Sequence, residues 1–311
     1  MRKKRTSQIA WLAASAVLLA LASGCGPAEN ETLQQQWGQT LGNTVDSISQ
    51  SISETAASVQ QSVALAADEW KDDLTFTGRS HDLSTSEAIG NASKLQLENA
   101  VGRLELKEGT SDQIVVKATI QAADLPARKE KLDTLFEQSE VTVTSQGNTA
   151  QVRVHAKGAP DQNLWDWAQK ELHFTEFRID YVVEVPAGIQ EFEVTNHVGE
   201  IAASGLTGTY RLKGEVGSIR VEDARLSGDS SIRTATGSIN LDILTLDTGG
   251  QLQAITDVGS ITATLDPSLA CDLETSSELG EVIGAAKGRS ERGGGGPLVA
   301  LETSIGSITV Q

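Results

Sequence analysis

Four acidic side chains in the second half of the chain have the chemistry of calcium ligands. Carboxylate oxygens are the ligands that Ca²⁺ prefers, and a repeating structure would bring them together on neighbouring strands. The sequence lacks the calcium-binding repeat G-G-x-G-x-D, however, and acidic residues on an alternating strand usually form a solvated face. We therefore expect no metal site from these residues, which are Asp257, Glu274, Glu278 and Glu281.

The other chemistry-bearing residues form no catalytic or cofactor motif. The histidines, His81, His155, His173 and His197, are too far apart in sequence for two of them to share one turn or strand, as metal ligands usually do. The G-x-S-x-G motif of a nucleophilic serine is absent. The run Gly293–Gly296 lacks the Lys-Ser/Thr that completes a phosphate-binding loop, and we interpret it as a flexible loop. We expect no catalytic residue, no cofactor and no metal.

The first 25 residues have the pattern of an export signal that ends at a modified cysteine. Residues 2–5 are basic, residues 9–21 are apolar, and Ala22-Ser23-Gly24 precedes Cys25. The apolar run is shorter than the roughly 20 residues that span a bilayer, but it suits a secretory signal. The segment resembles the lipobox of bacterial lipoproteins, in which the cysteine is acylated and becomes the mature N-terminus. The alternative is an ordinary secretory signal, with Cys25 incidental.

The lipobox resemblance implies a cellular location. Residues 1–24 would be the lipoprotein signal peptide, and acyl chains on Cys25 would hold the mature protein on a membrane. The protein would then be extracytoplasmic, on the outer face of the cell membrane or on the outer membrane if the cell has two.

Charge and cysteine content exclude two classes of protein. The chain has 42 acidic and 25 basic side chains, a formal net charge of −17, and loss of the four basic residues of the signal leaves −21. A nucleic-acid partner requires clustered Lys and Arg, so we expect none. Besides Cys25 the only cysteine is Cys271, which excludes a disulfide framework. Its apolar neighbours indicate a buried thiol rather than a reactive one.

Residues 25–93 are expected to separate the lipid anchor from a folded domain. Between residues 31 and 71, an apolar side chain recurs every three or four positions, which is the period of an amphipathic helix. This helix is equally compatible with a self-associating or partner-binding stalk, with a tether, and with a helix packed on its own domain. Residues 72–93 are polar and are expected to form a linker.

The body of the chain contains a repeat of an apolar residue, glycine, a small or acidic residue, and an aliphatic residue. Short alternating strands precede and follow each glycine, and about 20 residues separate one glycine from the next. Two short strands per repeat predict the stacked coils of a β-solenoid, with glycine at a positive-φ corner. The aliphatic residues after the glycines, Ile201, Ile219, Ile239, Ile261, Val282 and Ile308, would stack in one buried row. The repeat glycines are Gly199, Gly217, Gly237, Gly259, Gly280 and Gly306, with an early copy at Gly102.

Residues 94–192 differ from the repeats at about 193–311. They contain alternating strands, one expected helix over Ala127–Gln138, and nearly all the aromatic residues of the body. A thicker core of this kind would cap the open end of the solenoid, which would otherwise be a reactive sheet edge. The predicted fold is therefore mainly β: one β-solenoid domain with a small α+β N-terminal cap, preceded by a helical spacer.

The strand Ile179–Gly188 and the serial Gly-Ser-Ile units resemble the bacterial putative-adhesin family of β-strand repeats, a domain of unknown function. The similarity covers about residues 94–311 and includes the lone helix and the glycine-rich loop at Gly293–Gly296. It implies a β-solenoid-like envelope protein, frequently membrane-anchored, with no established enzymatic activity or cofactor. The family has no catalytic residues to transfer to this chain.

Two classes of function remain open. The first is a non-catalytic, adhesin-like or envelope-associated module that binds an unknown protein or a cell-wall polymer, or serves as a scaffold. The second is a polysaccharide-active β-helix enzyme, which would need two carboxylates and an aromatic platform in one groove. The solenoid is almost free of aromatic residues, and its negative charge would repel acidic polymers, so we favour the first class.

We predict that Cys25→Ala releases the protein from the membrane, because the acyl chains are the expected anchor. Fractionation into membrane and soluble pools measures the change, with the unmodified chain as the control. Retention of the variant in the membrane pool would contradict lipidation at Cys25.

Overall fold

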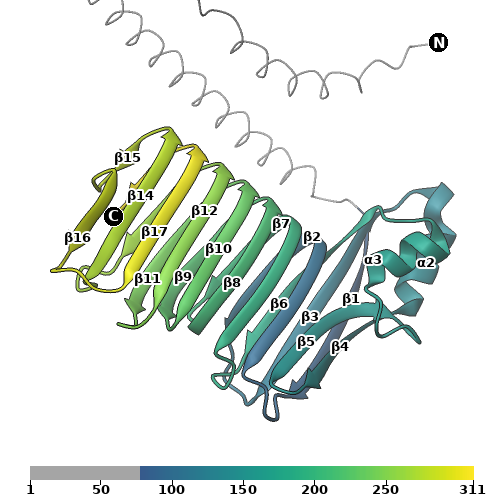
Figure 1. Ribbon diagram of the computed structural model, residues 1–311. Coiled ribbons are helices and arrows are strands. Elements are labelled where there is room, and N and C mark those ends of the chain that lie inside the picture. Colours follow the sequence, from purple (N-terminus) through teal and green to yellow (C-terminus); the bar gives the residue numbers. More distant parts are fainter. Residues whose placement is uncertain (1–77) are drawn as a thin grey trace, which may run out of the picture. The chain divides into compact units, whose positions relative to one another are not determined.

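The computed structural model describes residues 78–311; the predicted signal peptide, Cys25 and the helix expected over residues 31–71 lie outside this part. The described part is mainly β, as predicted, and its strands belong to one sheet of 18 strands (Figure 1). None of its helices is long and apolar enough to cross a membrane.

The first part of the sheet carries the helices. Figure 1 shows α2 and α3 at one end of the row of strands, next to β1, whereas β15 and β16 lie at the opposite end of the row. The elements in chain order are β1 (Gly78–Ala88), β2 (Lys94–Glu108), β3 (Gln113–Ala123), the 3₁₀ turn η1 (Pro126–Arg128), α2 (Lys129–Gln138), β4 (Ser139–Gln146), β5 (Thr149–Ala156), α3 (Leu164–Trp167), the π-helical turn η2 (Ala168–Leu172) and β6 (Phe177–Val185).

The second part consists of strands alone. They are β7 (Glu191–Ser204), β8 (Thr207–Val216), β9 (Ile219–Leu226), β10 (Asp229–Thr236), β11 (Ile239–Leu246), β12 (Gln251–Val258), β13 (Ile261–Leu265), β14 (Cys271–Leu279), β15 (Val282–Ile283), β16 (Gly288–Arg292), β17 (Leu298–Ile305) and β18 (Ile308–Val310).

These strands form repeated units, each made of a strand, a glycine corner and a second strand. In the first two units a single strand, β2 or β7, contains the glycine corner, at Gly102 or Gly199. The later units are β8–β9, β10–β11, β12–β13, β17–β18 and β14–β15. The first strands of the units pair in parallel in the order β2, β7, β8, β10, β12, β17, β14. The second strands pair in parallel in the matching order. Each unit therefore lies on its neighbour through both of its strands, in register except for the bulge where β9 pairs with β11.

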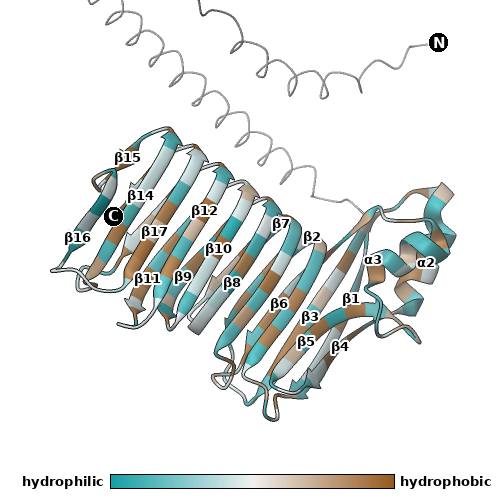
Figure 2. Ribbon diagram, viewed as in Figure 1, coloured by the Kyte–Doolittle hydropathy of each residue, from teal (hydrophilic) through white to brown (hydrophobic). Residues whose placement is uncertain are grey.

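The row of aliphatic residues that follow the glycines forms the core between these strands. Ile201, Ile219, Ile239, Ile261 and Ile308 are buried to about 1% exposure or less, whereas Val282 is half-buried. Figure 2 shows the matching alternation of hydrophobic and hydrophilic bands along the strands. The expected stacking in sequence order is wrong at its end, because Ile308 pairs with both Ile261 and Val282 and lies between them.

The C-terminal unit reaches this inner position because the chain reverses after β15. β16 pairs antiparallel with β14 on one side, and β17 pairs with β14 in parallel on the other side. The run Gly293–Gly296 makes the connection past the start of β14. A Cβ at Gly296 would lie 2.7 Å from the carbonyl oxygen of Ala270, so only glycine fits this crossing.

The glycine corners approach one another through their backbones. The repeat glycines have φ between 123° and 151°, a region that residues with a Cβ rarely adopt. A Cβ at Gly237 would overlap the carbonyl oxygen of Gly217, and one at Gly259 would overlap that of Gly237. The corners are therefore closed to any larger residue for two reasons, backbone conformation and contact with the next unit.

A row of buried polar side chains lies three positions before six of the seven repeat glycines; Gly217 has Gly214 at this position. Asn99 of β2 donates a hydrogen bond to a carbonyl of β6, and each of the other side chains donates to a glycine carbonyl of the neighbouring unit on the β2 side. Each bond thereby satisfies a polar atom at the corner. The donors and acceptors are Asn99 to Ile179 (3.0 Å), Asn196 to Gly102 (2.8 Å), Thr234 to Gly217 (3.4 Å), Thr256 to Gly237 (3.0 Å), Thr303 to Gly259 (3.0 Å) and Ser277 to Gly306 (2.8 Å).

The polar linker expected over residues 72–93 is wrong for Gly78–Ala88, which form strand β1. This strand pairs antiparallel with β3 along its full length, from Gly78 opposite Ala123 to Ala88 opposite Gln113. It lacks the apolar alternation of a half-buried strand because Leu83 is its only large aliphatic residue. Its extended conformation therefore depends on pairing with β3 and not on the hydrophobic pattern of its own sequence.

The helix expected over Ala127–Gln138 is confirmed as η1 followed by α2. Leu132, Leu135 and Phe136 of α2 are buried, so one face packs on the sheet. The short helix α3 and the turn η2 were not expected from the sequence.

We predict that Gly237→Ala destabilises the protein strongly. The strained φ costs about 1–3 kcal/mol, and the overlap with the Gly217 carbonyl adds about 1–3 kcal/mol. The midpoint of urea unfolding measures the loss. Gly249→Ala is the matched control, because no atom lies within 4 Å of its Cβ position, and its free energy of unfolding should stay within about 0.5 kcal/mol of the parent. Equal losses in the two variants would contradict the role of the corners.

Candidate functional site

The candidate site lies where one corner of the structure is opened by an insertion. β2 pairs in parallel with β5 up to Leu97–Val152 and with β6 from Leu104–Tyr181. Leu97 and Leu104 are seven positions apart, whereas their partners Val152 and Tyr181 are 29 positions apart. β5 and β6 thus form one more unit, in which residues 157–176, with α3 and η2, replace the tight glycine corner.

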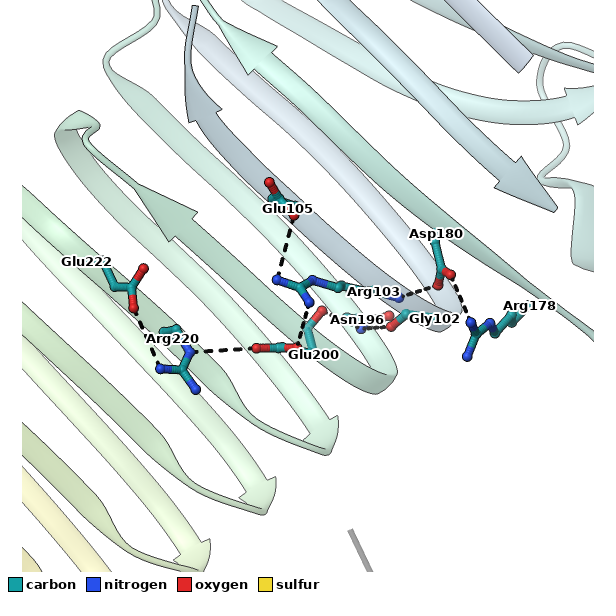
Figure 3. Close-up of polar contacts among 9 residues, drawn as sticks. All are labelled: Gly102, Arg103, Glu105, Arg178, Asp180, Asn196, Glu200, Arg220 and Glu222. Carbon is teal, nitrogen blue, oxygen red and sulfur yellow. Dashed lines mark hydrogen bonds and ion pairs between the residues drawn. The ribbon is translucent and has the colours of Figure 1, made fainter. Parts of the chain in front are cut away.

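Polar contacts around Gly102 stabilise the place beside the opened corner where β2 begins to pair with β6 (Figure 3). The Asn196 amide donates to the Gly102 carbonyl at 2.8 Å. The backbone N–H of Arg103 donates to the Asp180 carboxylate at 2.9 Å, and Asp180 also pairs with Arg178 at 3.2 Å. A side chain of β6 thus supplies the acceptor for a backbone N–H of β2 where the two strands begin to pair.

From Arg103, a chain of surface ion pairs extends across β7 to β9. It contacts Glu200 at 3.6 Å, and Glu200 contacts Arg220 at 3.8 Å (Figure 3). All three side chains are at least partly exposed, and exposed ion pairs contribute at most about 1 kcal/mol each. They orient the surface beside the corner and are not a site by themselves.

The opened corner contains a pocket of about 440 Å³. This lies within the range of roughly 300–1,000 Å³ that is usual for small-molecule sites. Its lining residues are Gln96, Glu98, Asn99 and Ala100 of β2, Gln151, Val152, Arg153 and Val154 of β5, Asp161, Gln162, Asn163, Trp165 and Asp166 of the insertion and α3, Ile179 and Tyr181 of β6, and His197 of β7.

Two buried polar atoms of this pocket have no hydrogen-bond partner within the protein: Oδ1 of Asn99 and Nε1 of Trp165. Asn99 is 3% exposed. Its Nδ2 faces two oxygens, the Ile179 carbonyl at 3.0 Å and Oδ1 of Asn196 at 3.2 Å, and this fixes which end of the amide is the oxygen. Two residues of the pocket lining thus hold one unpaired buried acceptor and one unpaired buried donor, and such buried groups require an explanation.

The aromatic residues of the pocket are held by their neighbours. The Trp165 ring stacks on Phe177, with ring centroids 3.9 Å apart and an interplanar angle of 11°. Tyr181 is 3% exposed, and its burial raises the pKa of its phenol well above 10, against the smaller effect of a hydrogen bond with the Val154 backbone. The phenol is therefore neutral at every physiological pH.

A chain of side-chain hydrogen bonds crosses three strands to the pocket. Gln96 donates to Glu193 at 3.1 Å, Gln151 donates to Gln96 at 3.3 Å, and Arg153 donates to Gln151 at 3.0 Å. At its far end Glu193 pairs with Lys94. The hydrogen bond with Lys94 holds the pKa of Glu193 below its ordinary value of 4.5, although partial burial opposes this shift.

The rim of the pocket is acidic. Glu98, Asp161 and Asp166 are its carboxylates, and Asp166 is fixed by a reciprocal pair of hydrogen bonds with Asn163 at 2.8 and 2.9 Å. His197 lies 3.4 Å from Glu98. Arg153, the permanent cation of the lining, uses its guanidinium on the Pro160 carbonyl at 2.7 Å and on Gln151. The rim thus accepts more hydrogen bonds than it donates.

The histidines of the sequence prove to have separate environments. His155 is buried and contacts Thr142 Oγ1 at 3.0 Å, His81 stacks on Phe136, and His173 ends η2. His197 alone among them reaches the pocket. Within residues 78–311, no three His, Cys, Asp or Glu side chains lie close enough to hold a metal ion, Asp257, Glu274, Glu278 and Glu281 included.

The repeat glycines lie along the corners, and only Gly102 borders the candidate site. The expectation of a buried Cys271 is confirmed, and burial raises the pKa of its thiol. Asn99 and Trp165 were not expected from the sequence. The signal for Asn99 is its place three residues before Gly102, where five of the six other units carry Asn, Thr or Ser and the β8–β9 unit carries Gly214. The signal for Trp165 is weaker, a polar, Trp-containing segment between two strands.

Comparison with known proteins yields structural neighbours only. No model of a protein family matches the chain, and no curated protein matches it. A putative cell adhesion protein from Clostridium sporogenes has 13% identity and a TM-score of 0.43, and the match covers 75% of this chain and 99% of that one. A putative adhesin from Bacteroides fragilis has 13% identity and a TM-score of 0.34, covering 74% and 97%. A putative lipid binding protein from Parabacteroides distasonis has 10% identity and a TM-score of 0.28, covering 75% and 98%. Values of this size do not establish a common function.

We predict that Glu193→Gln lowers stability at neutral pH by up to about 1 kcal/mol, the scale of a partly exposed ion pair. Because the folded-state pKa of Glu193 is depressed, its contribution is present above pH 4.5 and is lost as the pH falls through the folded-state pKa. Urea unfolding of both proteins at several pH values measures the difference, which should shrink in acid. A difference that stays constant into strong acid would contradict the charge-dependent contact with Lys94.

Proposed function

We propose that the chain is an extracytoplasmic lipoprotein, anchored through lipid on Cys25, with a non-catalytic β-solenoid over residues 94–311 that acts as an adhesin-like or envelope-associated binding module. Two features support the solenoid: the matching parallel order of both strands of every unit, and the glycine corners that carry the same positive φ. The signal and lipobox pattern supports the anchor.

The observation that carries a binding role is the pocket at the opened corner. An insertion that replaces a tight glycine corner costs chain entropy, and here it creates a pocket whose lining includes Asn99 and Trp165, each with one unpaired buried polar atom. Buried unpaired donors and acceptors are costly unless a ligand or water completes them. The acidic rim and the buried amide suit recognition of an uncharged polar partner.

A second candidate function is a polysaccharide-active enzyme. One observation favours it: the pocket places the carboxylates Asp161 and Asp166 beside Trp165. Both carboxylates are exposed, however, and Asp166 is engaged by Asn163. A glycosidase needs a carboxyl that is kept protonated by a secluded environment. The arrangement therefore suits binding better than hydrolysis.

We predict that the purified full-length protein sediments with insoluble cell-wall polymer and releases no reducing ends from it. Sedimentation follows from a binding module, and the absence of product follows from the exposed carboxylates. Immunoblotting of the pellet and a reducing-sugar assay of the supernatant measure the two outcomes, with an unrelated acidic lipoprotein as control. Release of reducing ends would instead support the enzyme.

A further inference from the structure

We infer that residues 52–70 of this chain pack as a helix along an exposed row of apolar side chains at the glycine corners. The inference goes beyond the proposed function, because it assigns an occupant to a surface of the domain whether or not Cys25 carries a lipid. The surface belongs to the described residues 78–311, and the occupant precedes them and is characterised by its sequence.

The row consists of the residues that immediately precede the repeat glycines. It includes the last residues of β10, β12, β17 and β14, whose ends lie side by side in Figure 1. Val216 is 47% exposed and Leu279 is 41% exposed, and the other members are half-buried. None of the aliphatic members belongs to the hydrophobic core or to the side chains packed against it. In the order of their pairing, the members are Val101, Val198, Val216, Thr236, Val258, Ile305 and Leu279.

Polar residues border this apolar row on both sides. The positions just before it include the exposed carboxylates Glu215, Asp257 and Glu278, and the positions just after the glycines carry Arg, Glu or Ser. Because paired strands are about 4.8 Å apart, the seven members extend over about 29 Å. A continuous exposed apolar stripe with a polar rim is the pattern of an interaction surface.

Residues 52–70 have an apolar stripe of nearly the same length. A helix over these residues would be about 27 Å long at 1.5 Å per residue. A helix of this size is marginally stable alone in water, so it needs a surface on which to bury its stripe. The members of the stripe, which recur every three or four positions, are Ile52, Ala56, Val59, Val63, Ala67 and Trp70.

The charges of the helix are compatible with the acidic rim of the row. At 3.6 residues per turn, Glu54, Asp68 and Glu69 fall away from the apolar stripe, and uncharged Ser, Thr and Gln residues flank it. These flanking side chains can donate hydrogen bonds to the carboxylates of the rim. An anionic membrane would be repelled by the same carboxylates, and a second copy of the domain would bring two acidic rims together. The helix of the same chain is therefore the occupant that fits best.

The chain enters the described domain close to the start of the row. β1 begins at Gly78 beside Ala123, the end of β3, and β6 begins beside that end of β3. β6 in turn lies beside β2 at the first corner, where a Cβ at Gly102 would overlap a carbonyl of β6. Gly78 is thus three strands from this corner, or about 15 Å. Residues 71–77 span up to about 23 Å when extended, which is enough to bring Trp70 onto the row.

The test is hydrogen–deuterium exchange of the purified full-length chain, measured by mass spectrometry on peptides that cover residues 52–70. We expect their amides to exchange at least about tenfold more slowly than in an unstructured chain. The protection should not depend on protein concentration, because helix and row belong to one chain. Peptides from the strands β7–β18 show in parallel that the domain is folded.

Matched variants place a charge on each of the two surfaces. Val63→Asp lies in the apolar stripe and should remove at least about tenfold of the protection, because a buried carboxylate is costly. Leu65→Asp is its control on the opposite face of the helix and should retain the protection. Val216→Glu lies in the row and should also remove the protection, whereas Ile283→Glu, at an exposed aliphatic residue outside the row, should retain it.

The contrary outcomes are equally definite. Rapid exchange of residues 52–70 in the unmodified chain overturns the inference, and so do equal effects within either matched pair. Protection that increases with protein concentration, or that is lost in Val63→Asp but survives Val216→Glu, assigns the helix to self-association and also overturns it. None of these results bears on the lipid anchor or on sedimentation with wall polymer, so the inference and the proposed function can fail separately.

Discussion

The backbone contact between glycine corners is the constraint on which the rest of the structure depends. The corners of neighbouring units approach so closely that a Cβ at Gly217, Gly237 or Gly259 would overlap the carbonyl of the preceding corner. At Gly237 and Gly259 the threonine three positions earlier then donates to that carbonyl from inside. Because the corners stack on one another, the strand residues next to them are held in register, and the aliphatic row that follows the glycines is continuous.

The candidate site follows from the one place where this constraint is released. In the unit formed by β5 and β6, the corner opposite Gly102 is expanded by residues 157–176. The polar row ends there, so Asn99 has a carbonyl to donate to but no further side chain that donates to its oxygen. The pocket thus lies where the row of buried polar side chains ends. An insertion at one corner thus opens a pocket without altering the regular units.

The features that the sequence predicted are the local and periodic ones. The glycine corners, the aliphatic row and the helix α2 each have a pattern that spans a few residues, and the corner and helix patterns have direct steric causes. The features that it did not predict depend on distant pairing. β1 is a strand because β3 lies beside it, and β17 lies inside β14 because the chain crosses back at Gly293–Gly296. The pocket belongs to this second group, since it needs the different partners of the two halves of β2. Its residues show no spacing in the sequence that would place them together.

The inner position of the C-terminal β17–β18 unit also explains how the end of the stack can be exposed to solvent. A stack of parallel strands that ended in sequence order would leave the apolar β17–β18 unit as its outer edge, a template for pairing with another chain. Placing this unit inside leaves β14 at the end, and β14 is covered by the antiparallel strand β16, which carries Arg289, Glu291 and Arg292. At the other end, polar β1 covers β3 in the same antiparallel manner. Charged or polar antiparallel strands thus cover β14 at one end and β3 at the other, which disfavours edge-to-edge pairing at these two strands. Within residues 78–311, β15 (Val282–Ile283) is paired only with β18 and keeps its other edge open.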